Sequence, residues 1–181
     1  MSRPFPYRFV TGNAGKLAEA RRIVGADLES VAIDLPEIQS GDLEEVLRAK
    51  AGAARERVGA AVVVEETGLE LAALSGFPGP LVRWMLAAVG AEGIARCALA
   101  LGDSRAVARC ALLAVDDDRT LFAEGATTGN LVLPARGGNG FGWDPVFVPD
   151  EEIRTYGEMS DAEKDSIGHR GRAWRLLLEQ I

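Results

Sequence analysis

The chain has 181 residues, of which 48% are hydrophobic and 26% are charged, so it can bury the core of one ordinary globular domain and is not disordered. Its formal net charge of −7 excludes broad binding to duplex nucleic acid, which usually needs a basic face, although a few lysines and arginines can still hold a small anionic ligand. The two cysteines exclude a disulfide framework and a cysteine-based metal knuckle.

The N-terminal residues, 1–9, lack the long apolar core of a signal peptide. No apolar run reaches the roughly 18 residues that are needed to span a membrane. We therefore expect a soluble, cytoplasmic protein with no membrane contact, folded as one domain over residues 1–181.

The first third of the chain alternates between strand and helix patterns. Apolar residues recur at helical spacing over 16–24 and again over the alanine-rich segment 43–58. Strand patterns precede both helices, over 5–10 and 28–35. A continuous apolar run over 60–64 then ends in two glutamates, which is typical of a buried strand whose C-terminal end opens into a site.

A rigid Gly-Pro turn at 76–80 leads into the second half, where a hairpin replaces the alternation. Because strands and helices alternate early and the hairpin comes late, we expect a mixed α/β sheet rather than a purely parallel one. The elements expected in this half are helices over 81–89 and 91–101, strands over 106–115 and 120–128 joined by a turn at 116–118, a glycine-rich loop over 134–142, a short strand over 145–148, and a last helix from 166 or 168 to 179.

The first segment that can carry chemistry is TGNAGK at 11–16, between the first strand and the first helix. Backbone N–H groups at a helix N-terminus attract phosphate, Gly12 and Gly15 let the backbone approach closely, and Lys16 can neutralise phosphate charge. The segment is not a Walker A loop, because the Gly-Lys-Ser/Thr ending is absent. The alternative interpretation is an ordinary capped helix.

The second segment is the acidic pair Glu65 and Glu66 after the apolar strand. Adjacent carboxylates are costly there unless a cation or solvent relieves them. Carboxylate oxygens suit Mg²⁺, which usually takes one or two of them together with substrate phosphates. Glu37, just after the second strand, is the candidate partner, and the alternative is a solvated acidic turn.

Two later segments can form a pocket for a base. Phe141 and Trp143 alternate with glycines in NGFGWDP and can present flat faces to a base, although a pair of core aromatics is the better interpretation of this segment by itself. His169, the only histidine, and Arg170 begin the last helix. A lone histidine is more often structural than catalytic, whereas Arg170 offers a fork of donors that suits a carbonyl or a phosphate.

Taken in order along the chain, these segments resemble the inosine triphosphatase family, also called the Ham1-like or non-canonical purine nucleotide pyrophosphatases. The resemblance extends from Phe9 to about Leu177. A chance match of six motifs in the same order is not credible. The motifs are TGNAGK at 11–16, DLPEIQ at 34–39, VEETGLE at 64–70, GFPGPLVRW at 76–84, FGWDPVF at 141–147 and AEKDSIGHR at 162–170.

The resemblance implies a fold and an activity. The implied fold is an elongated mixed β-sheet flanked by helices, with two lobes, an active-site cleft between them, and a homodimer as the assembly. The implied activity is that of an acid-anhydride hydrolase, an Mg²⁺-dependent nucleoside-triphosphate pyrophosphohydrolase. It converts non-canonical purine nucleotides such as ITP, dITP and XTP to the monophosphate and pyrophosphate, which cleans the nucleotide pool.

The resemblance also implies a role for each matching residue. Glu37 and Glu66 match the metal-binding acids, and Glu66 and Lys16 match the catalytic residues. Phe141 and Trp143 are expected to stack on the base. The implied substrate-binding residues are Thr11, Gly12, Asn13, Ala14, Gly15, Lys16, Lys50, Glu66, Thr67, Arg83, Phe141, Gly142, Trp143, Asp144, Lys164, His169 and Arg170.

The chain departs from the family pattern at a few positions. Glu66 stands where an aspartate is usual, which bears on the rate, and Gly168 stands where a serine is usual, which bears on the rigidity of the base pocket. Arg83 replaces a common lysine and Asp165 a common asparagine. Two alternatives stay open. One is a related pyrophosphatase for pyrimidine or other modified nucleotides, and the other, prompted by Glu66 and Gly168, is a catalytically weak nucleotide-binding protein.

Overall fold

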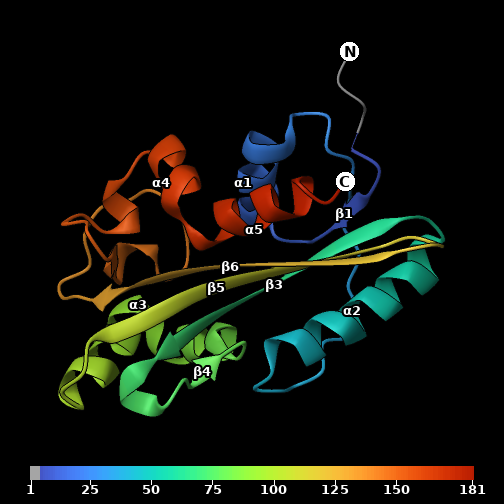
Figure 1. Cartoon of the computed structure of the whole chain (residues 1–181). Coiled ribbons are helices and arrows are strands. Elements are labelled where there is room, and N and C mark those ends of the chain that lie inside the picture. The colour runs from blue at the N-terminus through green and yellow to red at the C-terminus, as the bar shows by residue number, and fades with distance from the viewer. Residues whose placement is uncertain (1–4) are drawn as a thin grey trace.

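The fold is built on one long, twisted mixed sheet with helices on both faces (Figure 1). A computed structural model of the chain describes residues 5–181. Residues 1–4 lie outside this range, and the prediction that the N-terminus carries no signal peptide partly falls on them. Over the described residues the strand order is β2-β1-β3-β5-β6-β7, with β4 paired to β3. The strands are β1 (Arg8–Val10), β2 (Ser30–Val31), β3 (Val62–Leu71), β4 (Pro78–Gly79), β5 (Arg105–Val115), β6 (Thr120–Leu131) and β7 (Phe147–Pro149).

Parallel and antiparallel pairing meet in this sheet, as the sequence pattern predicts. Strand β1 runs parallel to both β2 and β3, because α1 and α2 provide the crossover connections that parallel strands need. Strands β3, β5 and β6 form the long antiparallel centre, where β5 and β6 make the expected hairpin. The mixed α/β fold with helices flanking the sheet is confirmed.

One edge of β3 is open at its middle. Strand β5 pairs with β3 along its whole length. On the other edge, β1 pairs with β3 only at Val62 and Val63, and β4 pairs with it only at Leu69 and Glu70. Within the described part of the chain, residues 64–68 therefore have no strand beside them on this edge.

The helices cover the sheet from both sides. Helices α1 and α5 lie on one face and α2 on the other, while α3 packs near the end of the sheet where β4 joins (Figure 1). Asn13 begins α1, since its side chain accepts a hydrogen bond from the Lys16 N–H, and Asp42 caps α2 in the same way. The helices are α1 (Ala14–Val24), α2 (Leu43–Val58), α3 (Val82–Ala100), α4 (Asp161–Ile167) and α5 (His169–Leu178), and the short 3-10 turns are η1 (Ala72–Leu74), η2 (Asp144–Val146) and η3 (Tyr156–Glu158).

The hydrophobic core has separate parts at the two ends of the sheet. At one end, α1 and α5 pack on the sheet around Trp174, whose ring meets Phe9 edge-on at a centroid distance of 5.2 Å. At the other end, α3 and η2 pack around Phe147 and Tyr156. The open middle of β3 lies between these two ends. Over residues 5–181, no helix combines the length and the apolar character that crossing a membrane requires.

Several predicted boundaries were wrong, and tertiary pairing explains most of them. The strand predicted over 60–64 continues to Leu71, because β5 supplies partners along that whole length, so the two glutamates lie in mid-strand and not at its end. The strand predicted over 28–35 shrinks to Ser30–Val31, because its partner β1 is only three residues long. The strand predicted over 5–10 likewise begins only at Arg8.

Three helical features were hard to place from the sequence. The predictions of helices over 81–89 and 91–101 correspond to α3, which is interrupted at Gly90 with φ 70° and ψ 175°. Helix α4 was missed, although Ser160 and Glu163 form a capping box that signals its start. The residues Asp144–Val146 form η2 rather than a strand, since Pro145 cannot donate to a sheet ladder.

Candidate active site

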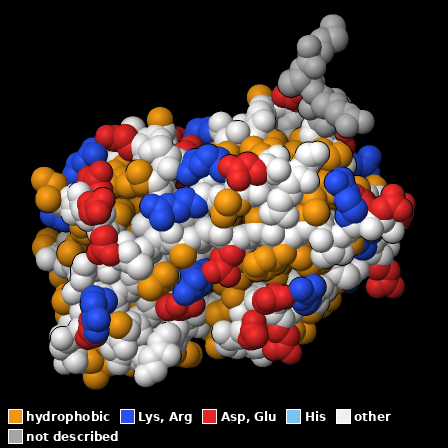
Figure 2. Space-filling model, viewed as in Figure 1, with side chains coloured by type: hydrophobic (Ala, Val, Ile, Leu, Met, Phe, Trp, Pro, Cys, Tyr) orange, Lys and Arg blue, Asp and Glu red, His pale blue; other side chains and the backbone are white. Residues whose placement is uncertain are grey.

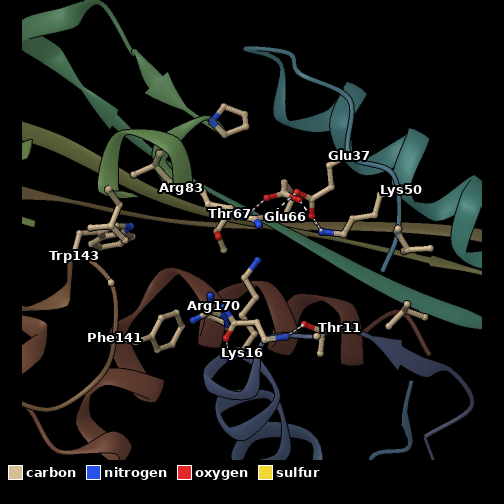
Figure 3. A pocket seen from close by; sticks show the side chains of 18 of the residues that line it. Thr11, Lys16, Glu37, Lys50, Glu66, Thr67, Arg83, Phe141, Trp143 and Arg170 are labelled. Carbon is tan, nitrogen blue, oxygen red and sulfur yellow. Dashed lines mark hydrogen bonds and ion pairs between the residues drawn. The ribbon is translucent and has the colours of Figure 1, made fainter. Parts of the chain in front are cut away.

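A cleft of about 710 Å³ opens at the unpaired middle of β3. It gathers side chains from the N-terminus of α1, from α2 and α3, from the loop before η2 and from the junction of α4 and α5 (Figure 3). Of the residues predicted to bind substrate or metal, only Ala14 and Gly15 do not line it. Those that do are Thr11, Gly12, Asn13, Lys16, Glu37, Lys50, Glu66, Thr67, Arg83, Phe141, Gly142, Trp143, Asp144, Lys164, His169 and Arg170.

The segment 11–16 is both a helix cap and a wall of the cleft. The Asn13 N–H donates to Thr11 Oγ1 at 3.1 Å, and Asn13 Oδ1 accepts from the Lys16 N–H at 3.0 Å. This cap fixes the first turn of α1, whose N-terminus has the partial positive charge that favours an anion. A glycine at position 15 avoids a close contact, because a Cβ there would come within 2.7 Å of the Phe141 ring.

Two carboxylates and two cations form a cluster across the cleft from α1. Lys50 Nζ lies 2.9 Å from Glu37 Oε1 and 3.0 Å from Glu66 Oε2, while Arg83 Nη1 lies 3.1 Å from Glu37 Oε2. Burial alone would raise the pKa of Glu37, but Lys50 and Arg83 hold it below its usual value. Burial would lower the pKa of Lys50, but the charges of Glu66 and Glu37 raise it. Glu37 and Lys50 therefore stay ionised at neutral pH.

The same cluster fits a magnesium site. The oxygens of Glu37 and Glu66 converge on one point, which the ammonium of Lys50 fills, and the carbonyl oxygen of Glu65 faces that point at 3.3 Å. Across residues 5–181, no group of three or more His, Cys, Asp or Glu side chains is placed to hold a metal. Two carboxylates match Mg²⁺, which is usually held by one or two of them and completes its shell with water and substrate phosphates.

Glu65 and Glu66 point to opposite faces of the sheet, because successive side chains alternate along a strand. Glu65 is 2% exposed and lies on the side of α1 and α5, where its carboxylate accepts from Arg170 Nε at 3.0 and 3.1 Å. Lys16 Nζ lies 3.4 Å from the same carboxylate. Glu65 does not line the cleft, so it is a counter-ion for two cleft residues rather than a second acid beside Glu66.

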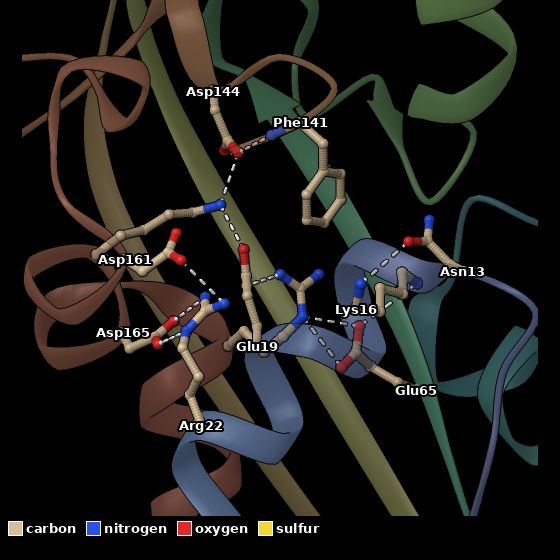
Figure 4. A network of polar contacts seen from close by, with 11 residues as sticks. Asn13, Lys16, Glu19, Arg22, Glu65, Phe141, Asp144, Asp161 and Asp165 are labelled. Carbon is tan, nitrogen blue, oxygen red and sulfur yellow. Dashed lines mark hydrogen bonds and ion pairs between the residues drawn. The ribbon is translucent and has the colours of Figure 1, made fainter. Parts of the chain in front are cut away.

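Glu65 belongs to a buried chain of alternating charges (Figure 4). Lys164 Nζ lies 2.6 Å from Asp144 Oδ2 and 2.7 Å from Glu19 Oε1, and Glu19 also accepts from Arg170. The order from one wall of the cleft to the other is Asp144, Lys164, Glu19, Arg170, Glu65 and Lys16.

Acidic and basic side chains are equal in number in this buried row, so their charges balance, which lets the row be buried. Burial would raise the pKa of Glu19, but Arg170 and Lys164 lower it below the usual value. For Asp144, burial outweighs Lys164 and raises the pKa. Sequence reasoning missed Glu19, although a charged residue between the apolar positions Leu17 and Ala20 of an amphipathic helix is a usable signal.

The aromatic wall of the cleft has one open ring and one buried ring. Trp143 is only 8% exposed and packs in the core, with ring centroids 5.4 Å from both Phe147 and His169. Phe141 is half-buried, and Lys164 Nζ lies 4.9 Å from its ring centroid. Phe141 therefore offers more free ring surface than Trp143, so the two aromatics are not equivalent.

The only histidine is buried beside this wall. Burial, followed by the charges of Arg170 and Lys164, lowers the pKa of His169 well below its usual value, so the imidazole is neutral. Its Nδ1 has no hydrogen-bond partner among the described residues. The base pocket expected from the sequence is thus made of a neutral imidazole, an arginine and an aromatic ring.

The fold and the site together define an α/β protein with a charged cleft suited to a ligand that carries both phosphates and a flat ring. A family model described as the Ham1 family matches residues 7–180. The chain belongs to the Ham1 family.

Two inosine triphosphate pyrophosphatases match nearly the whole chain. An inosine triphosphate pyrophosphatase from Puccinia graminis f. sp. tritici is 38% identical over 184 residues, covering 96% of this chain and 95% of the relative. Another, from Podospora anserina, is 43% identical over 175 residues, covering 94% and 91%.

Solved structures share the fold. A HAM1 protein from Coxiella burnetii superposes with a TM-score of 0.81 at 27% identity, covering 98% of this chain and 100% of that one. A structure described as nucleoside-triphosphatase / dITP/XTP pyrophosphatase from Mycobacterium abscessus has a TM-score of 0.65 at 31% identity, covering 95% and 98%.

Proposed function

We propose that this protein is a nucleoside-triphosphate pyrophosphohydrolase, a hydrolase of acid anhydrides that acts on ITP, dITP and XTP. The observation that carries the proposal is the cleft itself. It sets the α1 N-terminus, the Glu37–Glu66 pair and the base wall around one space of about 710 Å³. Relatives that are 38–43% identical over most of the chain are inosine triphosphate pyrophosphatases, which supports the same activity.

The phosphate end of the cleft provides positive charge from several directions. Lys16 and the α1 N-terminus face it from one side, and Lys50 and Arg83 from the other. Phosphoryl transfer depends largely on such positioning and charge stabilisation. Glu37 and Glu66 are the residues that would hold Mg²⁺, and the metal, when bound, would neutralise charge that develops on the phosphate oxygens.

The chemical step needs a base, and Glu66 is the acid that faces the cleft. Its carboxylate accepts a proton from the attacking water as the water oxygen bonds to the α-phosphorus. The bond from the α-phosphorus to the bridging oxygen of the β-phosphate breaks, and pyrophosphate leaves with that oxygen. The products are the nucleoside monophosphate and pyrophosphate.

The base end of the cleft favours a purine with a carbonyl at C6. Arg170 donates from Nε to Glu65 and from Nη1 to Glu19. Among the described residues, its Nη2 donors have no partner. A C6 carbonyl can accept from Nη2, whereas the amino group of adenine would leave these donors unpaired. An unpaired buried polar group costs roughly 1–3 kcal/mol, which disfavours ATP.

A panel of triphosphates tests this function. Purified protein with Mg²⁺ is expected to release pyrophosphate from ITP, dITP and XTP and to act much more slowly on ATP and GTP. Release of orthophosphate instead, or equal turnover of ATP, contradicts the proposal. Preference for a pyrimidine or another modified nucleotide favours the related pyrophosphatase, and tight ITP binding without turnover favours a nucleotide-binding protein.

A homodimer and a cytoplasmic location stay predictions of the sequence.

A further inference from the structure

Lys50 occupies the point where the proposed metal-binding oxygens converge. A lysine ammonium has three donors. Here three oxygens surround it: Glu37 Oε1 at 2.9 Å, Glu66 Oε2 at 3.0 Å and the carbonyl oxygen of Glu65 at 3.3 Å. Its donors are therefore all used on the protein, and none is left for a phosphate (Figure 3).

The surroundings hold this arrangement in place. Lys50 projects from the middle of α2, and its side chain is 12% exposed, so solvent competes little for its donors. Glu66 is similarly protected, with a side chain 13% exposed. Arg83 holds the second oxygen of Glu37 at 3.1 Å, but its own side chain is 73% exposed. Lys50 and Arg83 are thus two cations on one acid, one enclosed within the cluster and one at its rim.

We propose that Lys50 is a built-in counter-ion that occupies the divalent-cation position of the empty cleft and moves to the phosphates when the metal arrives with nucleotide. The proposal rests on the Mg²⁺ site of the proposed function. It assigns Lys50 a role in the order of binding: the free protein binds divalent ions poorly, and metal and nucleotide enter together.

The physical reason is a competition for the same oxygens. An ammonium and a divalent cation repel each other and cannot both lie between Glu37 and Glu66. Without a polyphosphate, a metal would have to drive Lys50 off its three acceptors and leave the ammonium unpaired. With a polyphosphate, the displaced ammonium gains phosphate oxygens in exchange, so the displacement becomes favourable.

Titration of the nucleotide-free protein with Mn²⁺, followed by electron paramagnetic resonance, tests the proposal without any turnover. The neutral variant Lys50→Met is expected to lower the Kd for Mn²⁺ about tenfold or more relative to the wild type, because the metal no longer displaces charge-assisted hydrogen bonds. The matched control is Arg83→Met, which removes a positive charge from the same acid at the rim. It is expected to change the Kd much less.

Two further variants locate the gained site. Adding Glu66→Gln to Lys50→Met should abolish the gain in affinity for Mn²⁺, because Glu66 supplies one of the oxygens that bind the metal in this cluster. A gain that persists would come from other acids on the surface. Lys50→Gln, checked for folding by its thermal unfolding curve, repeats the loss of charge with a side chain that still donates hydrogen bonds. It should also bind Mn²⁺ more tightly than the wild type.

Adding pyrophosphate completes the test. It should strengthen Mn²⁺ binding to the wild type more than to Lys50→Met, since only the wild type has an ammonium to transfer. An unchanged Kd in Lys50→Met, an equal gain in Arg83→Met, or no detectable binding in any variant would overturn the proposal. If the protein releases no pyrophosphate from the triphosphates but the Kd for Mn²⁺ changes as expected in these variants, the proposed function is overturned and the role of Lys50 stands.

Discussion

At the scale of single residues, the alternation of β3 separates two neighbouring acids into different roles. Glu66 faces the cleft and Lys50, whereas Glu65 faces the buried charges between α1 and α5. Glu66 is one methylene longer than the aspartate usual at this position, so it retains the charge but alters the reach. A misplacement of about 1 Å can cost on the order of 100-fold in rate, which makes this residue the first to test.

We expect Glu66→Gln to lose nearly all turnover of ITP at saturating Mg²⁺, because an amide can neither accept the proton nor hold the metal as well. Glu66→Asp should stay active. Steady-state pyrophosphate release measures both variants. Wild-type turnover in Glu66→Gln would remove Glu66 from the mechanism, and Glu65 could not replace it, since that side chain lies on the other face of the sheet.

Glu65 is expected to matter for stability. Glu65→Gln leaves the buried guanidinium of Arg170 and the ammonium of Lys16 short of a counter-charge, and breaking a buried ion pair in this way costs about 3–5 kcal/mol. The matched control is Glu70→Gln on the same strand, whose half-exposed pair with Arg109 is worth about 1 kcal/mol or less. Urea unfolding of both variants checks this, and equal losses would contradict it.

His169 links pH to stability in a way that can be isolated, because the chain has one histidine. Its folded pKa lies well below the usual value, so below about pH 6.5 the unfolded chain binds a proton that the folded chain does not. The contribution of His169 to stability therefore decreases as the pH falls through this range. Between pH 7 and 5.5 the loss should be about 1 kcal/mol.

Urea midpoints of the wild type and His169→Gln at these two pH values measure the effect. The variant should lose the histidine contribution and show a flatter pH dependence between pH 7 and 5.5. The same slope in both proteins would assign the effect to other groups.

At the scale of elements, the two aromatic residues of the loop before η2 have different roles: Trp143 packs in the core, and Phe141 faces the cleft. Trp143 is held by Phe147 and His169, so Trp143→Ala should destabilise the protein by about 3–5 kcal/mol. Phe141 lies over Gly15 at the cleft, and stacking on a base is worth roughly 1–3 kcal/mol. Phe141→Ala should therefore raise KM for ITP about tenfold with a smaller loss of stability. Steady-state kinetics and thermal unfolding should be measured for both variants. A Trp143→Ala variant that has a changed KM and an unchanged stability would contradict this division.

At the scale of the whole molecule, charge is spread rather than gathered. Figure 2 shows acidic and basic side chains interspersed over the face it displays. Apolar side chains are also exposed around the start of α3, including Phe77 at 53%, Trp84 at 56% and Val89 at 49%. This region overlaps the segment 80–89, which we expect to form part of a homodimer interface.

The dimer prediction can be checked by light scattering at micromolar concentration. The wild type should have twice the 19.2 kDa mass of the chain, and Trp84→Glu should reduce the mass to that of one chain. Ile153→Glu is the matched control, because Ile153 is 85% exposed outside this region and its replacement should leave the dimer intact. A wild type with the mass of a single chain would refute the dimer.

Much of the architecture was predictable because its signals are local. Helix α2 has the predicted bounds, since Asp42 caps one end and Gly59 ends the other in a left-handed conformation. The β5–β6 hairpin follows from alternation around the turn at 116–118. Most of the predicted site residues line one cleft. The segment 11–16 is the part of the cleft that local sequence specifies, because Asn13 caps the helix that begins there.

Tertiary structure alone decided the rest, because strand ends and charge partners depend on residues far away in the chain. The length of β3 was decided by β5, and the gap that opens the cleft by β1 and β4 stopping short of each other. Glu19 and Lys164 are 145 residues apart and meet only after α1 and α4 pack. The sequence by itself determined which chemical groups the cleft holds, and folding decided which acid faces the ligand and which cation fills the metal position.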